Sequence, residues 1–168
     1  MHTTSFWLTL GHSLLADLPF SLSERQSGIF GLLYALGSMA TLLMMCDRRD
    51  LGTAVGERPP SAANEIDWED FAAPAKPSEA EAFFEPNLYI YDAYPGGIGI
   101  SESLYRACDA LLHRTLELIS ACTCESGCPS CVGPTADRSE RTKEVALEIL
   151  GQLCRDTQFL ATRTIESA

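Results

Sequence analysis

Two hydrophobic segments in the chain have the residue types of β-strands. Residues 4–10, TSFWLTL, mix β-branched, aromatic and leucine side chains. Residues 87–92, NLYIYD, place tyrosines on both sides of Ile90. We therefore predict a β-strand at each position, and a small sheet built from them.

A long apolar run lies between these segments. Residues 29–46 contain no charged side chain, and Ser23, just before Glu24, is expected to cap a helix that ends near Cys46. Because the run is apolar nearly all round, we expect a central helix. Its length reaches the lower limit for a membrane span. The sequence offers no second span and no pair of flanking aromatic belts, so a buried core helix is favoured.

Two more helices follow from apolar positions spaced by three and four residues. The first is expected from Ser101 to Cys122, and the second, after a capping-box pattern at Asp137 and Glu140, to about Cys154. The elements predict an α+β fold: a helix-majority single domain over residues 1–168, with a small sheet and a four-cysteine loop.

Residues 57–86 differ in composition from the rest of the chain. They are rich in proline, alanine and acidic residues. This composition is typical of a long loop, and we expect the segment to be mobile.

The charge of the chain limits its partners. The formal net charge is −11, with 12 Lys and Arg against 23 Asp and Glu. An acidic surface repels phosphate backbones, so weak or indirect DNA binding is expected of the chain alone. No secretory signal is visible, and seven cysteines suit disulfide pairing poorly. Both observations favour the cytoplasm.

Four of the cysteines form the pattern C-x-C-x3-C-x2-C: Cys122, Cys124, Cys128 and Cys131. Four thiolates fill a tetrahedral zinc site and leave no open position, which is typical of a structural ion, one per chain. Two alternatives remain. The CPSC pair resembles the dithiol of thiol-disulfide oxidoreductases, and four thiolates also bind iron–sulfur clusters.

A glycine-rich turn, residues 91–101, separates the second strand from the next helix. Its spacing does not match G-x-G-x-x-G, and no G-x4-GK[ST] occurs in the chain. We therefore expect a tight turn instead of a nucleotide site. Asp92 could pair with Arg48 or Arg49, although a solvated DRRD segment fits the sequence equally well. We find no catalytic constellation.

Four blocks in order, HTTSFWL, LMMCDRRDLG, YIYDAYPGGIGISES and CTCESGCPSCVG, resemble the MrfA-like zinc-binding domain over residues 2–154. That domain is found at the C-terminus of DEAD/DEAH-box superfamily 2 DNA helicases, including proteins that resemble the Hrq-type branch of RecQ-related helicases. The resemblance places the metal site of the family on the same four cysteines.

The resemblance implies a non-catalytic accessory module of an ATP-dependent DNA helicase, active in DNA repair or unwinding. Its partners would be helicase motor domains, in the same chain or a separate one, with no membrane. Walker A and DEAD/DEAH motifs are absent from this sequence, so we expect no ATP hydrolysis by that mechanism. We expect the chain to be a helicase tail, either a fragment or a separate protein.

Overall fold

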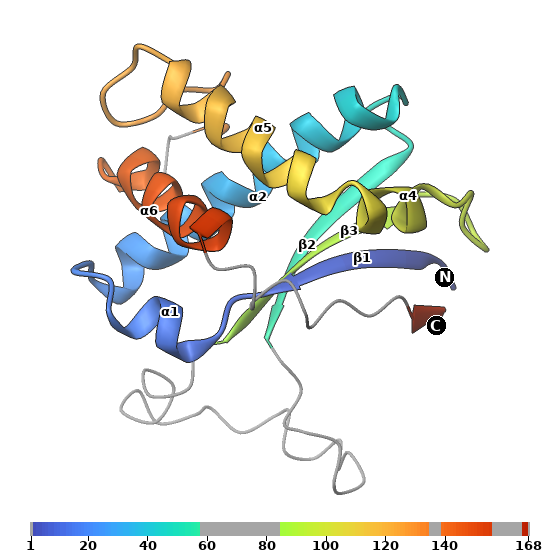
Figure 1. Ribbon diagram of the computed structural model, residues 1–168, viewed down its shortest axis with the longest axis horizontal. Helices are drawn as coiled ribbons and strands as arrows, with labels where there is room; N and C mark the ends of the chain where they lie inside the picture. Colours follow the sequence, from blue (N-terminus) through green and yellow to red (C-terminus); the bar gives the residue numbers. More distant parts are fainter. Residues whose placement is uncertain (1, 58–84, 135–138, 156–165, 168) are drawn as a thin grey trace, which may run out of the picture.

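The computed structural model describes residues 2–57, 85–134, 139–155 and 166–167 (Figure 1). The elements in chain order are β1 (Thr4–Thr9), α1 (His12–Ala16), α2 (Leu22–Met44), β2 (Leu51–Glu57), β3 (Pro86–Asp92), α4 (Ile100–Arg106), α5 (Cys108–Ala121), α6 (Thr142–Arg155) and β4 (Glu166–Ser167). The helices outweigh the strands, so the α+β, helix-majority prediction is confirmed. The limits of the single domain, 1–168, stay a prediction.

The strands form one antiparallel sheet in the order β2-β3-β1-β4. β1 and β3 are the two predicted strands, and they pair with Trp7 opposite Tyr89. β2 was not predicted. It pairs with β3 along its whole length, from Leu51 opposite Asp92 to Glu57 opposite Pro86.

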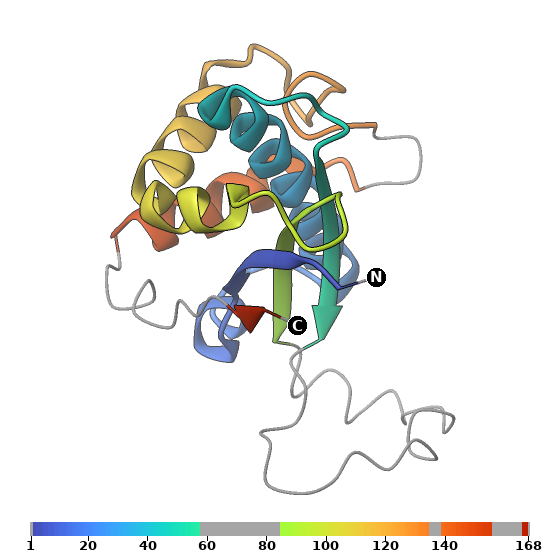
Figure 2. The same cartoon turned by 90° about the vertical axis from the view of Figure 1, so that its right-hand side faces the viewer.

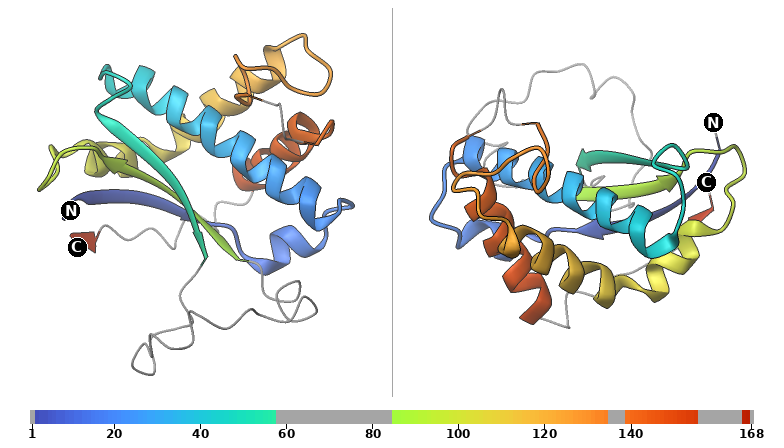
Figure 3. Two further views of the ribbon diagram at one scale, coloured as in Figure 1. Left: turned by 180° about the vertical axis from the view of Figure 1, so that it is seen from behind. Right: turned by 90° about the horizontal axis from the view of Figure 1, so that it is seen from above.

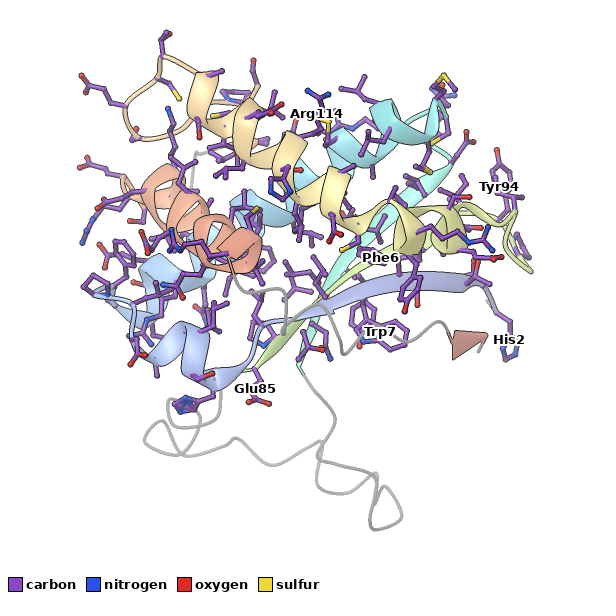
Figure 4. All side chains as sticks on the ribbon, viewed as in Figure 1. His2, Phe6, Trp7, Glu85, Tyr94 and Arg114 are labelled. Carbon is purple, nitrogen blue, oxygen red and sulfur yellow. The ribbon has the colours of Figure 1, made fainter. Side chains whose placement is uncertain are left out.

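The helices cover one face of this sheet (Figures 2 and 3). Side chains alternate along β1, so that Phe6 and Leu8 are buried while Trp7 is half-buried. Phe6 points toward the helices and Trp7 toward the other face (Figure 4). The hydrophobic core therefore lies between the sheet and the helices, as period-two alternation requires.

Helix α2 is the centre of the helical layer. It packs against α5, α6 and β2, which explains why its sequence is apolar nearly all round. Among the described residues it is the helix whose length and composition would allow it to cross a membrane. Its contacts on several sides are those of a core helix, the interpretation that the sequence favoured.

The start of α2 differs from the prediction. The N-cap is Ser21 and not Ser23: the Ser21 hydroxyl accepts a hydrogen bond from the Glu24 amide, and the Glu24 carboxylate accepts one from the Ser21 amide. This reciprocal pair is a capping box, which needs a spacing of three residues. Only Ser21 stands at that spacing from Glu24.

The helix predicted from Ser101 to Cys122 is two helices. α4 ends and α5 begins around Ala107, whose ψ of 13° is not helical. α4 packs on β1 and β3, whereas α5 packs on α2 and α6. The direction of the chain changes because the two segments have different packing partners.

The predicted loop at residues 57–86 is shorter at both ends, since Glu57 and Pro86 belong to β2 and β3. Residues 58–84 lie outside the described residues, and so does Asp137 of the predicted capping box. Glu140 precedes α6, which begins at Thr142, so Glu140 is not in the first turn of that helix.

Candidate metal centre

The four cysteines lie in the loop that joins α5 to α6, at the end of the helical layer (Figure 1). α5 buries Leu111, Leu112, Thr115 and Ile119, and this packing fixes the direction in which the helix ends. Cys122 is its C-cap residue, in an extended conformation, with its amide donating to the Ile119 carbonyl at 3.4 Å. The first cysteine is thus placed by a packed helix.

The second half of the loop is a tight turn. The Cys128 carbonyl accepts hydrogen bonds from the amides of Cys131 and Val132, both at 3.1 Å. The Cys128 amide donates to the Cys131 sulfur at 3.3 Å. Gly127 enters this turn with φ of +117°, and a Cβ there would lie 2.4 Å from Val132 Cγ2. Only glycine fits this position without strain.

The four sulfurs converge on one point. All lie within 4.8 Å of one another, and four of the six pairs are 3.5–3.7 Å apart. A tetrahedron with Zn–S bonds of about 2.3 Å has edges of about 3.8 Å. The loop therefore presents its sulfurs at the spacing that a single tetrahedral ion requires. Metal binding by these four residues stays a prediction.

The thiols of the last pair, Cys128 and Cys131, differ in acidity. Hydrogen bonding by the Ser130 amide, together with the Cys122 and Cys131 thiols, lowers the pKa of Cys128 to about 6. Burial raises the pKa of Cys131 to about 12. A bound cation favours the thiolate form of every ligand.

A lysine that the sequence analysis did not consider supports the first half of the loop. Lys143, in the first turn of α6, is buried, and its ammonium donates to the carbonyls of Cys122 and Cys124 at 2.6 and 2.7 Å. A signal was present in the sequence: Lys143 precedes Ala146 by three residues and therefore falls on the apolar stripe of the helix.

The remaining cysteines lie apart from this cluster. Cys108 is fully buried in the core, and Cys46 and Cys154 are half-buried against it. Burial raises the pKa of the Cys46 and Cys154 thiols. All three behave as small apolar side chains.

The glycine-rich turn is organised by Asp92, which is fully buried. Its Oδ2 accepts from the amides of Ile98 and Gly99 at 2.6 and 3.0 Å, and its Oδ1 accepts from the Ser101 hydroxyl at 2.9 Å. Burial opposes ionisation of Asp92, but hydrogen bonds from Ile98, Ser101 and Thr4 outweigh it and lower its pKa.

The hypothesis that Asp92 pairs with Arg48 or Arg49 is wrong. Both arginines are exposed, and the Arg48 guanidinium lies 5.0 Å from the centre of the Tyr34 ring. The amides of the turn already donate to the Asp92 carboxylate. The negative charge of this carboxylate would also repel a phosphate. The hydrogen bonds to Asp92 are those of a tight turn, and the absence of a nucleotide site stays a prediction.

The chain is similar to helicases and to one zinc-domain family. The family model of the MrfA Zn-binding domain matches residues 32–132. The uncharacterized ATP-dependent helicase YprA of Bacillus subtilis (strain 168) is 26% identical over 155 residues, which are 91% of this chain and 17% of YprA. The uncharacterized protein MJ1572.1 of Methanocaldococcus jannaschii is 42% identical over 48 residues, 29% of this chain and 43% of that protein.

Solved structures have a similar fold. The crystal structure of the DUF1998 helicase MrfA bound to DNA matches with a TM-score of 0.60 at 24% identity, covering 82% of this chain and 15% of that chain. The structure of the same helicase bound to DNA and AMPPNP matches with a TM-score of 0.50 at 25% identity. That match covers 87% of this chain and 15% of that chain. The chain thus spans less than a fifth of the helicases that it matches.

Proposed function

Because this chain belongs to the MrfA Zn-binding domain family, we propose that it is a zinc-stabilised, non-catalytic module of an ATP-dependent DNA helicase. The observation that carries the proposal is the convergence of four cysteine sulfurs at the edge length of a tetrahedral site. Four protein ligands leave no open position for substrate, so the ion would be structural. Cys122, Cys124, Cys128 and Cys131 would hold it.

The module would act through protein contacts with helicase motor domains. Among its relatives, YprA and MrfA are helicases in which the matching segment is a small part of the chain. The net charge of −11 opposes direct binding to a phosphate backbone. We propose a parent or partner of the DEAD/DEAH-box superfamily 2, working in DNA repair or unwinding in the cytoplasm, where cysteines stay reduced.

Metal analysis of the purified protein tests the zinc site. We expect one zinc ion per chain, and loss of that ion in Cys128→Ser, with a lower melting temperature because metal-binding energy is folding energy. Cys154→Ser is the matched control, since Cys154 lies outside the cluster and should keep its zinc. A protein free of metal after reduction and reconstitution would contradict the proposal.

The two alternatives have distinct outcomes in the same experiment. An iron–sulfur cluster inserts iron and sulfide between the cysteines, whereas the close spacing of the sulfurs supports the single ion that we propose. A thiol oxidoreductase is favoured by one observation, the separation of only 3.7 Å between the sulfurs of Cys128 and Cys131. Visible absorption with bound iron and sulfide would support the cluster, and a reversible Cys128–Cys131 disulfide without metal would support the oxidoreductase.

A chimera tests the helicase role. The chain would replace the matching segment of YprA, and DNA unwinding would be compared with YprA lacking that segment. We expect the chain to restore unwinding and its Cys128→Ser variant to restore less. Anisotropy with labelled oligonucleotides should show no salt-sensitive, sub-micromolar binding by the isolated chain. A chimera no more active than the deletion would exclude the helicase role.

A further inference from the structure

Lys143 is a buried cation beside the metal loop. Only 8% of the residue is exposed, and it lies on the face of α6 that also buries Ala146 and Leu150. Lysine is rarely buried to this degree without a partner, because removing an ammonium group from water costs several kcal/mol. Its position therefore needs a compensating interaction.

In the described residues, the hydrogen bonds that Lys143 donates go to the segment that carries the first two ligands. The ammonium donates to the carbonyls of Cys122 and Cys124, and the main-chain amide donates to the Ser126 carbonyl at 3.2 Å. A single residue thus ties α6 to three positions of the loop.

The two halves of the loop are supported differently. The turn at Cys128–Cys131 closes on itself through its own amides and the Cys131 sulfur. In the described part of the chain, the bonds that hold the carbonyls of Cys122 and Cys124 come from Lys143. Lys143 therefore holds the backbone of the first pair of ligands in place, and the tight turn does the same for the second pair.

The positive charge of the Lys143 ammonium is compensated by negative charge in the metal loop. Among the ion pairs of the described residues, none includes Lys143. Four thiolates around a divalent ion carry a net charge of about −2, and the carboxyl end of α5, at Cys122, adds partial negative charge. A cation in this position stabilises both.

We propose that Lys143 is a positioning residue of the metal centre, which orients Cys122 and Cys124 through their carbonyls and offsets the negative charge of the thiolates. This inference rests on the proposed zinc site. It predicts that metal affinity depends on a side chain that does not touch the metal. Such a dependence is common for the outer partners of metal ligands.

The test compares zinc affinity, measured by competition with a chromogenic chelator, in three variants of the full chain. Lys143→Met removes the ammonium and keeps the aliphatic stem. Arg141→Met is the matched control: it removes the same charge two residues before Lys143, where the guanidinium contacts Glu144, Glu24 and the Phe20 ring. Lys143→Arg restores the charge and two donors.

We expect Lys143→Met to bind zinc about tenfold or more weakly, within the range for outer-shell changes. Arg141→Met should bind within about twofold of the unmodified protein, since in the described residues its side chain contacts Glu144, Glu24 and Phe20 and not the cysteines. Lys143→Arg should recover part of the loss. With Co²⁺ in place of zinc, Lys143→Met at saturation should show shifted thiolate charge-transfer and d–d bands, a change that lower stability alone would not produce.

Equal zinc affinity in Lys143→Met and the unmodified protein would overturn the inference, as would an equal loss in Arg141→Met. If Lys143→Met does not fold, Lys143→Gln against Lys143→Arg decides, and equal affinities in that pair would also overturn it. Failure of the inference is distinct from failure of the zinc site: in the first case the unmodified protein binds one zinc, and in the second it binds none.

Discussion

Replacing Asp92 with asparagine would test how the glycine-rich turn is held. Asparagine keeps one oxygen, but its NH₂ group would face the amides of Ile98 and Gly99, which now donate to Oδ2. Hydrogen bonds to a charged group contribute about 1.5–3 kcal/mol each. Ile98 and Gly99 are exposed, so water can partly replace the acceptor, and the lower value gives about 3 kcal/mol for the two bonds.

The assay is urea unfolding followed by circular dichroism at constant zinc concentration. Asp92→Asn should shift the midpoint with an unchanged slope, and its melting temperature should fall by about 6–12 °C. Asp17→Asn is the control, because Asp17 is exposed after α1. A loss below about 1 kcal/mol in Asp92→Asn, close to that of a surface change, would refute the reasoning.

The same pair of proteins predicts a pH dependence. The pKa of Asp92 is lowered in the folded state, so the unfolded chain binds the proton more tightly. The contribution of Asp92 is therefore fully present above its unfolded pKa of about 3.9 and decreases as the pH falls toward the folded pKa. The stability difference between the unmodified protein and Asp92→Asn should be constant near neutrality and shrink in acid. Metal release in acid affects both proteins, so their difference isolates Asp92.

Three further predictions concern the helices, each measured by thermal unfolding with zinc present. Ser21→Ala removes the capping box and should cost about 1 kcal/mol, whereas Ser23→Ala should change little. Gly28→Ala should destabilise by about 1–3 kcal/mol, because a Cβ there would lie 2.3 Å from Val145 Cγ1; a neutral result would mean that α2 and α6 are less closely packed. Gly151→Ala should stabilise by up to about 1 kcal/mol, since its nearest neighbour would be the end of the Arg155 side chain at 3.4 Å.

The elements with strong local signals could be predicted from the sequence. The predictions of β1 and β3 depend on aromatic and β-branched residues, and that of α2 depends on its uncharged run. The structure has all three elements where they were expected. The proximity of the four cysteines is also local, because they occupy one short loop. Local patterns of this kind survive folding because tertiary contacts reinforce them.

The features that the sequence did not reveal depend on distant partners. β2, LGTAVGE, has little strand propensity of its own, and its two glycines lie beneath the rings of Tyr91 and Tyr89 of the neighbouring strand. The break at Ala107 has no proline or glycine to mark it and follows from packing on two different layers. The role of Lys143 needs α6 to fold back on the loop, which no spacing rule encodes.

The pairing of β2 with β3 also indicates where a probe can be inserted in the chain. Its last pair joins Glu57 to Pro86, at the end of the sheet that lies away from the cysteine loop (Figures 1 and 3). The pairing of β2 with β3 therefore ends at Glu57 and Pro86. A fluorophore or affinity tag inserted between these two residues would therefore stand apart from the cysteine loop, and the loop itself would carry no probe.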